Sequence, residues 1–358
     1  FEGEIMAAFA GQPGWLDIGR GRRSVVVCVK IGTSLRSFGA ERGWSIGLRE
    51  VCGAVKEGLY QTSNKVRRAG LDALLGGTTE DKTNASGDSV KALDVVANDV
   101  FVDALGRCEF VNMIASEEED NVVVKEDAAE EGYAVVFDPL DGSSNIAACI
   151  PTGTIFGVYK TAGSGPDQAL QLGSKLVLAG YCLYSAATVL VLSDGSGTFA
   201  FTLDSETGDF VLTHPNIKVP QSGSSYSVND GRFHDWPKGL QRYITDIKNG
   251  RGRTGRKYDT KYICSLVADV HYVLFRGGIA MNPRAHLRLV YEGNPIAFIV
   301  ENAGGAASTG VGRILEVVPT KPHHRLPIFV GSRLDIEELE SYDGKGGVRQ
   351  MYNPGYKY

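Results

Sequence analysis

The chain has 358 residues, of which 43% are hydrophobic, and a formal net charge of −5 at pH 7. This length allows two domains or one large α/β unit, and the acidic balance argues against a nucleic-acid partner. No apolar run reaches about 18 residues, which argues against a transmembrane helix and a membrane partner.

Six scattered cysteines include no Cys-x-x-Cys pair, and several lie in apolar runs. This usage predicts free thiols in a reducing compartment and argues against a structural zinc site. We therefore expect a cytoplasmic protein. Because the sequence begins at Phe1, a plastid location after removal of a presequence is the alternative.

Residues 1–44 give mixed signals and form an N-terminal segment of uncertain structure. From Ser45, whose hydroxyl suits an N-cap, apolar residues recur at helical spacing as far as Gly76 and Gly77. The polar, glycine-containing stretch 78–87 is predicted to be a mobile loop.

A second helix is predicted over about 89–105, with Asp88 as its cap. Apolar and alternating runs then predict β-structure at 111–115, 133–137, 154–159, 175–192, 199–212, 314–318 and 327–330. Further helices are expected at 269–276 and 295–303. The chain is expected to divide into α/β halves at 45–215 and 216–342, followed by a weakly ordered tail at 343–358.

The most informative motif is the turn at the end of the apolar run 133–137. Asp138 and Asp141 lie three residues apart there, and such carboxylates suit a hard cation such as Mg²⁺. The turn continues with Gly142, Ser143 and Ser144, whose backbone N–H groups suit a phosphate. One turn could thus hold a metal and its phosphate, although a tight turn without function is the alternative.

Further acidic residues could join this turn. Glu117 and Glu118 follow a predicted strand, where binding sites of α/β sheets occur, and a solvated acidic loop is the alternative. Asp88 and Asp94 flank the start of the second helix, where a cap plus a surface charge is the commoner arrangement. Glu292 interrupts an apolar run, which is unfavourable without a partner.

These carboxylates suit metal-assisted hydrolysis of a phosphate ester, in which two or more cations hold the attacking water and the leaving oxygen. A carboxylate that does not hold a metal could take the proton of the water. Serine-nucleophile chemistry is disfavoured because no Gly-x-Ser-x-Gly motif exists. The segment 163–165 is too short for a nucleotide-binding glycine motif.

The order of motifs resembles the class I fructose-1,6-bisphosphatase and sedoheptulose-1,7-bisphosphatase family. The resemblance covers about residues 45–342 and rests on segments 84–88, 91–94, 116–118, 137–146, 153–157, 266–270, 287–295 and 303–305. It implies a layered α/β/α/β/α fold with two mixed sheets. It also implies a Mg²⁺-dependent sugar-bisphosphate phosphatase, with Mn²⁺ or Zn²⁺ as substitutes, that assembles as a homodimer or homotetramer.

The resemblance also assigns roles to residues. The implied metal ligands are Glu117, Asp138, Asp141, Glu292 and the carbonyl of Leu140, with Asp88 reaching a further metal and joining the catalytic residues. Asp94 and Glu118 would handle the proton of the attacking water. Gly142, Ser143 and Ser144 would hold the 1-phosphate.

The expected site for the distal phosphate departs from the fructose pattern. Asn229 and Tyr262 match it, whereas two tyrosines, a lysine and an arginine borrowed from a neighbouring subunit are replaced by Arg232, Asn282, His286 and Lys261. The changes at Arg232 and Asn282 resemble the sedoheptulose branch. The segment 143–146 instead resembles the fructose branch.

We therefore predict hydrolysis of the 1-phosphate of sedoheptulose-1,7-bisphosphate, with fructose-1,6-bisphosphate as the alternative substrate. A non-catalytic sugar-phosphate sensor is a rival that the clustered carboxylates argue against, since they repel one another without a metal. Weak or absent AMP inhibition is also expected. AMP-inhibited members carry a lysine and an arginine where this chain has Gly132 and Lys160.

Overall fold

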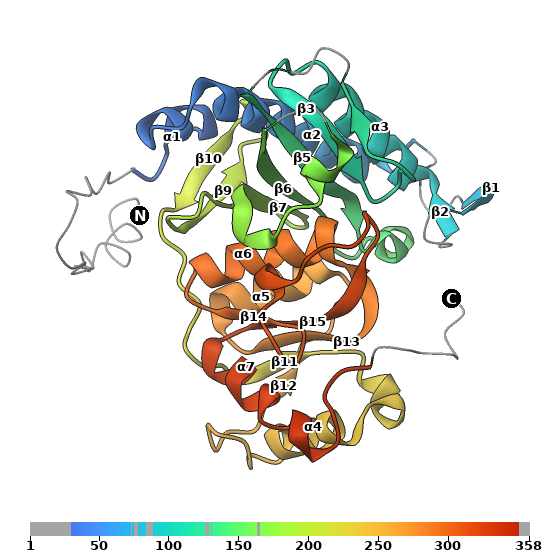
Figure 1. Ribbon diagram of the computed structural model, residues 1–358, viewed down its shortest axis with the longest axis vertical. Helices are drawn as coiled ribbons and strands as arrows, with labels where there is room; N and C mark the ends of the chain where they lie inside the picture. The colour runs from blue at the N-terminus through green and yellow to red at the C-terminus, as the bar shows by residue number, and fades with distance from the viewer. Residues whose placement is uncertain are drawn as a thin grey trace.

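The computed structural model describes residues 30–72, 74, 78–83, 89–125, 129, 131–162 and 165–350, without the side chains of 78–83, 89–90 and 162. The elements stack as five layers, α/β/α/β/α, as expected (Figure 1). In the described ranges, no helix is both long and apolar enough to cross a bilayer.

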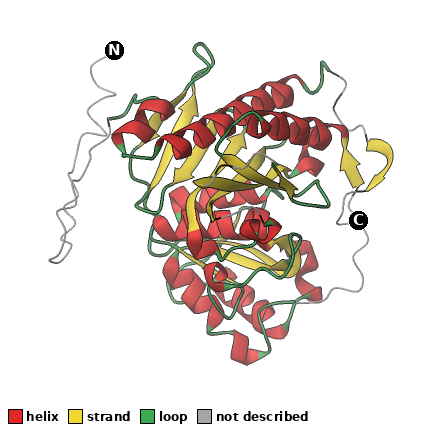
Figure 2. Ribbon diagram, turned by 45° about the horizontal axis from the view of Figure 1, so that its top comes forward, coloured by secondary structure: helices red, strands yellow, loops and turns green. Residues whose placement is uncertain are grey.

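Three layers are helical, and Figure 2 shows them separated by the two sheets. The layer on the large sheet contains α1 (Leu35–Glu41), α2 (Ile46–Arg68) and α3 (Ala92–Gly106). The layer between the sheets contains α5 (Leu266–Arg276) and α6 (Asn294–Asn302). The layer on the small sheet contains α4 (Lys238–Lys248) and α7 (Arg333–Glu340).

The large sheet has eight strands in the order β10 (Phe210–His214), β9 (Thr198–Leu203), β8 (Thr188–Ser193), β7 (Leu176–Tyr184), β6 (Thr152–Ala162), β5 (Glu131–Asp141), β3 (Val111–Ser116) and β4 (Val123–Val124). The small sheet has the order β12 (Asp259–Thr260), β11 (Ser225–Ser227), β13 (Ile279–Arg288), β15 (Arg325–Gly331) and β14 (Ala306–Ser308). Both sheets are mixed, because β3 pairs parallel with β5, and β11 pairs parallel with β12 and β13.

Strand β5 positions the metal-binding turn because it runs between two cores. Ala134 and Val136 belong to the core between the sheets, whereas Val135 and Phe137 belong to the core beneath α1–α3. A strand buried on both faces reads as a continuous apolar run, which is why this strand was predictable. Its last residues include Asp138 and Asp141, which are both buried.

The predicted start of α2 is confirmed, since the Ser45 hydroxyl accepts the N–H of Leu48 at 3.1 Å. The predicted end is wrong, because the helix stops at Arg68. The second helix begins at Ala92 rather than near residue 89, since β2 (Ser89–Lys91) pairs antiparallel with β1 (Thr78–Thr83). Residues 78–83 are therefore a strand, while 84–87 and Asp88 lie outside the described residues.

Two predictions near the C-terminus need correction. The apolar run 314–318 is not a strand but contains the 3₁₀ turn η7 (Ile314–Glu316), whose apolar side chains enter the central core. The tail is ordered further than predicted, because Val348 is buried and the Gln350 N–H donates to the Pro283 carbonyl. Residues 351–358 lie outside the described part.

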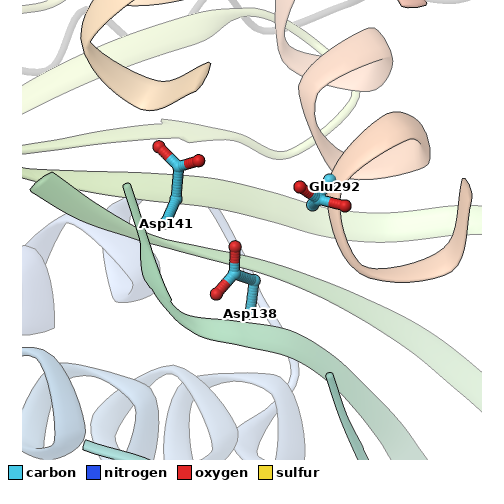
Figure 3. Close-up of side chains that lie close together, drawn as sticks. All are labelled: Asp138, Asp141 and Glu292. Carbon is cyan, nitrogen blue, oxygen red and sulfur yellow. The ribbon is translucent and has the colours of Figure 1, made fainter. Parts of the chain in front are cut away.

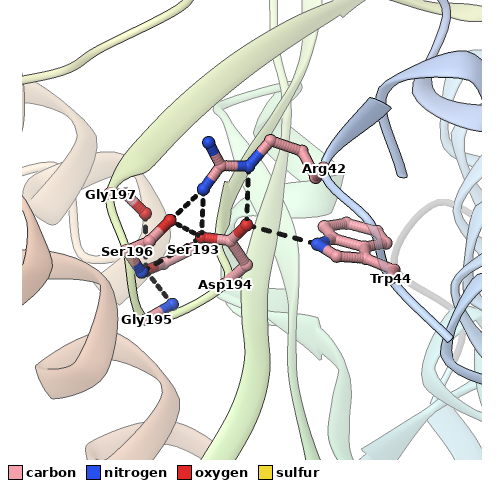
Figure 4. Close-up of polar contacts among 7 residues, drawn as sticks. All are labelled: Arg42, Trp44, Ser193, Asp194, Gly195, Ser196 and Gly197. Atoms are coloured by element: carbon pink, nitrogen blue, oxygen red, sulfur yellow. Dashed lines mark hydrogen bonds and ion pairs between the residues drawn. The ribbon is translucent and has the colours of Figure 1, made fainter. Parts of the chain in front are cut away.

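A polar cluster fixes the C-terminal end of α1 to the turn between β8 and β9 (Figure 4). Asp194 accepts the Arg42 Nε–H at 3.0 Å and the Trp44 indole N–H at 3.2 Å. Burial raises the pKa of Asp194, but hydrogen bonds from Ser196 and Arg42 outweigh it and lower the pKa below 3.8. This carboxylate is therefore a charged structural anchor at neutral pH.

Candidate active site

Three buried carboxylates meet where β5 ends (Figure 3). Asp138 and Asp141 come from β5, and Glu292 comes from the π-turn η6 (Leu289–Gly293); one oxygen of each lies within 4.8 Å of the others. Burial, followed by repulsion from Glu117, raises the pKa of Asp138 well above 3.8 and that of Glu292 to about 8. An all-oxygen, charge-rich set of this kind fits a hard divalent cation.

The fourth expected carboxylate, Glu117, lies at the end of β3 and makes a different contact. Its side chain forms an ion pair of 2.7 Å with Arg288, and both side chains are buried. The Arg288 backbone N–H also donates to Glu292. Arg288 thus places one positive charge among four carboxylates, a role that sequence reasoning did not assign because the partners are distant in the chain.

Asp141 is oriented by the start of α5. It accepts the Ser265 hydroxyl at 2.6 Å and the Val267 N–H at 2.9 Å, both at a helix N-terminus that favours negative charge. The next residue, Gly142, has φ +77°, and a Cβ there would lie 2.8 Å from the Ser265 Cβ. Glycine is therefore required for the turn to pass this close to α5.

The Asp94 carboxyl is suited to proton transfer. It lies buried in the first turn of α3, where it accepts the Lys91 N–H at 3.1 Å. Burial raises its pKa to about 7, so it can take up or release a proton near neutral pH. The Lys91 ammonium donates to the Ser143 carbonyl at 2.8 Å and joins α3 to the turn after β5.

Fewer contacts describe the other three residues that were expected near the metal or the phosphate. Glu118 is half-buried at the end of β3, and its N–H donates to the Ser116 hydroxyl at 3.2 Å. Leu140 is held by its N–H, which donates to Asp138 at 2.9 Å. Ser144 is exposed in the 3₁₀ turn η2 (Ser143–Ala148).

A separate pocket collects four of the six residues expected at the distal phosphate. It has about 450 Å³ of space, part of it open to solvent, and its lining includes Asn229, Arg232, Tyr262 and Asn282. Arg232 also pairs with Asp235 at 3.6 Å, and both side chains are about half exposed. The pocket therefore presents amide, phenol and guanidinium groups, which together suit an anion.

The remaining two expected residues do not line this pocket. Lys261 is exposed, and His286 is half-buried. Burial, followed by the nearby Arg284 and Arg288 charges, lowers the pKa of His286 to about 3, so it is neutral at pH 7. Arg284 does line the pocket and adds a second guanidinium that sequence reasoning did not flag.

The segment 262–265 connects the pocket with the carboxylate cluster. The Asn145 side-chain amide donates to the Ile263 carbonyl at 3.1 Å, and the Ile263 N–H donates to Asp269 at 2.8 Å. Tyr262 at one end lines the pocket, while Ser265 at the other end holds Asp141. One short segment therefore relates the position of a distal anion to that of the metal-binding turn.

Known proteins share both the sequence and the fold. Family models described as "Fructose-1-6-bisphosphatase, N-terminal domain" and "C-terminal domain" match residues 29–215 and 219–344. The chain belongs to the class I fructose-1,6-bisphosphatase family. It is therefore a phosphoric monoester hydrolase that acts on sugar bisphosphates.

Individual proteins with similar sequences or structures are also named fructose-1,6-bisphosphatases. A chloroplastic enzyme of Brassica napus is 43% identical over 79% of this chain and 74% of its own length. A class 1 enzyme of Chlorobium phaeobacteroides is 42% identical over 78% of this chain and 87% of its own. The holo structure of the Leishmania major enzyme has a TM-score of 0.82 and 36% identity over 88% of this chain and all of that one.

Proposed function

We propose that this protein hydrolyses the 1-phosphate of fructose-1,6-bisphosphate with Mg²⁺. The observation that carries the proposal is the buried set of Asp138, Asp141 and Glu292, of which Asp141 directly precedes the turn that begins at Gly142. The pocket with Arg232 and the names of the similar enzymes support a sugar with a second phosphate.

The residues divide the work by their chemistry. Glu117, Asp138, Asp141, Glu292 and the Leu140 carbonyl would hold Mg²⁺, and Asp88 would reach a further ion. When bound, Mg²⁺ would polarise the phosphate and acidify a water molecule. Mn²⁺ is the better substitute, since Zn²⁺ commonly takes nitrogen and sulfur ligands.

Protein groups would handle the proton and the phosphate. Asp94, whose pKa of about 7 follows from burial, would accept the proton of the attacking water, with Glu118 assisting. N–H groups of Gly142, Ser143 and Ser144 would bind the 1-phosphate. Arg288 would limit the repulsion among the carboxylates when no metal is bound.

Sedoheptulose-1,7-bisphosphate is the second candidate substrate. The relatives are named as fructose-1,6-bisphosphatases, so they favour fructose and give the sedoheptulose preference no support. One observation keeps the longer sugar in view, namely that Arg232 and Asn282 both line the distal pocket. Both residues stand at positions where the fructose-1,6-bisphosphatase pattern has tyrosines.

Comparison of kcat/KM for the two bisphosphates tests the choice, in the natural protein and in Arg232→Tyr. Because Arg232 is half exposed, its phosphate contact is worth about 1 kcal/mol, or roughly a fivefold change in KM. We expect fructose-1,6-bisphosphate to have the higher kcat/KM. A preference for sedoheptulose-1,7-bisphosphate that Arg232→Tyr abolishes would establish the second candidate instead.

We propose that residues 45–215 supply most metal-binding groups and that 216–342 supply the distal contacts together with Glu292. A homodimer or homotetramer, which light scattering can distinguish, would bring Lys261 toward a neighbouring subunit. We propose a cytoplasmic location with a plastid as the alternative, since the named relatives include bacterial and chloroplastic enzymes, and a fluorescent fusion would distinguish the two.

A further inference from the structure

The C-terminal segment 346–350 lies against the distal pocket. It follows α7, passes the start of α4 and reaches β13 (Figure 1). Gly346 and Gly347 have φ of +113° and +80°, a region that favours glycine, so they form the turn that directs the segment there. The Gly347 carbonyl accepts the Leu240 N–H at 3.0 Å, and Val348 is buried in the core that the small sheet forms with α4 and α7. The segment is therefore a packed part of the fold.

The segment meets β13 where this strand leaves its partner β15. The register of the β13–β15 pairing shifts within residues 282–287. In this stretch the Ala285 N–H donates to the Gln350 carbonyl at 3.1 Å, and the Gln350 N–H donates to the Pro283 carbonyl at 2.6 Å. The two bonds form a parallel bridge between Arg284 and Gln350. The backbone of Gln350 is thereby fixed against β13.

The bridge also determines which way its two side chains point. Residues that pair across neighbouring strands have their side chains on the same face, so those of Arg284 and Gln350 lie together. Both residues line the distal pocket, whereas the preceding residue Arg349 does not. Arg349 lies beside Gly310, with its Cβ 3.5 Å from the position that a Cβ would take there. Gln350 therefore reaches the pocket through its place in the bridge.

The charge and the donors of the pocket suit a phosphate group. Its described lining includes two arginines, Arg232 and Arg284, and one carboxylate, Asp235, which gives a net charge of +1. A phosphate monoester carries close to two negative charges at pH 7 and has three strong acceptor oxygens. Guanidinium groups donate to such oxygens in pairs, and a glutamine amide adds two further N–H donors.

We propose that Gln350 and Arg284 determine specificity for a sugar that carries a distal phosphate. The Gln350 amide donates a hydrogen bond to this phosphate, and Arg284 supplies a second guanidinium opposite that of Arg232. The inference rests on the proposed function, because it assigns further contacts to the same substrate. Neither residue belongs to the carboxylate cluster, so both act on binding rather than on the reacting phosphate. The C-terminal segment thus becomes part of the substrate site.

Kinetics with two substrates test the role of Gln350. Gln350→Ala removes the amide side chain and leaves both backbone bonds of the bridge possible. It should raise the KM for fructose-1,6-bisphosphate about three- to tenfold and change kcat less than about twofold. Fructose-1-phosphate lacks the distal phosphate, so its KM should change less than about twofold. Gln350→Glu should raise the KM for the bisphosphate at least about tenfold, because it places a negative charge beside the phosphate.

Two further variants locate the effect in the pocket. Arg284→Met should reproduce the KM increase of Gln350→Ala, and it remains informative if a Gln350 variant does not fold. Arg349→Met is the matched control, since this neighbouring side chain lies outside the pocket lining. Its KM for both substrates should stay within about twofold of the natural value. Thermal unfolding of each variant verifies that the comparison is made between folded proteins.

Binding of fructose-6-phosphate, measured by calorimetry in EDTA, separates this inference from the proposed function. The ligand carries only the distal phosphate, and no turnover is needed. The natural protein should bind it about three- to tenfold more tightly than Gln350→Ala does. If this difference appears but no phosphate is released from fructose-1,6-bisphosphate, the proposed function fails and the role of Gln350 stands.

Three results would overturn the inference. The first is equal affinity of the natural protein and Gln350→Ala for fructose-6-phosphate. The second is an equal KM increase for fructose-1,6-bisphosphate and fructose-1-phosphate in Gln350→Ala, which would show that the distal phosphate is not involved. The third is an Arg349→Met variant whose KM for the bisphosphate rises as much as that of Gln350→Ala, which would indicate a general effect of changing the segment.

Discussion

Replacement of Glu292 by Gln removes one charge from the buried carboxylate cluster while keeping the size of the side chain. Burial, followed by repulsion from Glu117, raises the pKa of this carboxyl from 4.5 to about 8. At pH 7 the folded, metal-free protein keeps Glu292 protonated, whereas the unfolded chain ionises it. Linkage converts this difference into roughly 3 kcal/mol of lost folding free energy.

Glu292→Gln should therefore raise the free energy of unfolding of the metal-free protein by up to about 3 kcal/mol at pH 7. The amide oxygen can still accept the Arg288 backbone N–H. Because the folded pKa is the higher one, the gain should be absent near pH 4.5 and should grow until about pH 8. Turnover should fall sharply, since the variant lacks one proposed metal ligand.

Urea unfolding at pH 5, 7 and 8, with EDTA or with Mg²⁺, measures these effects. Mg²⁺ should stabilise the natural protein more than the variant, because ligand binding stabilises only the folded state. Glu316→Gln is the matched control, since this side chain is 69% exposed and its change should stay within about 0.5 kcal/mol. A metal-free Glu292→Gln protein that is less stable at pH 8, with an undiminished Mg²⁺ effect, would refute the reasoning.

Three further predictions concern catalysis, regulation and stability. Asp138→Asn should cut Mg²⁺-dependent phosphate release by at least about a hundredfold while thermal unfolding stays cooperative, because a charged ligand is lost; near-normal release would refute the ligand role. AMP should inhibit weakly or not at all, since Lys160 pairs with Glu131 at 3.2 Å and Gly132 offers no cation; half-inhibition at micromolar AMP in a turnover assay would contradict this. Asp194→Asn should destabilise the fold by about 1–3 kcal/mol in urea at pH 7 without changing turnover, because it weakens the bonds from Arg42. The lowered folded pKa of Asp194 means that this difference should shrink only as the pH falls below about 4; a constant difference down to pH 2 would argue against a charged anchor.

Local patterns predicted the parts of the site that lie close together in the chain. The apolar run into Asp138 identified β5, and the glycine after Asp141 marked a turn that only glycine fits. Helix α4 was overlooked although Leu240, Tyr243, Ile244 and Ile247 recur at helical spacing, so its signal was present.

Contacts between distant segments could not be predicted. Neither the pairing of Arg288 with Glu117 nor the bond from Ser265 to Asp141 leaves a periodic signal, because each depends on how the layers stack. The run 314–318 was misassigned because its apolar character reflects burial of a turn in the core between the sheets. Apolar runs report burial more reliably than they report strand geometry.

The most direct test of the central claim is phosphate release from fructose-1,6-bisphosphate by the natural chain and by Asp138→Asn, each with Mg²⁺ and with EDTA. We predict one phosphate released per sugar, with fructose-6-phosphate as the product, only in the natural chain with Mg²⁺. Release that continues in EDTA, or that is equal in Asp138→Asn, would contradict a metal-dependent phosphatase site at the end of β5.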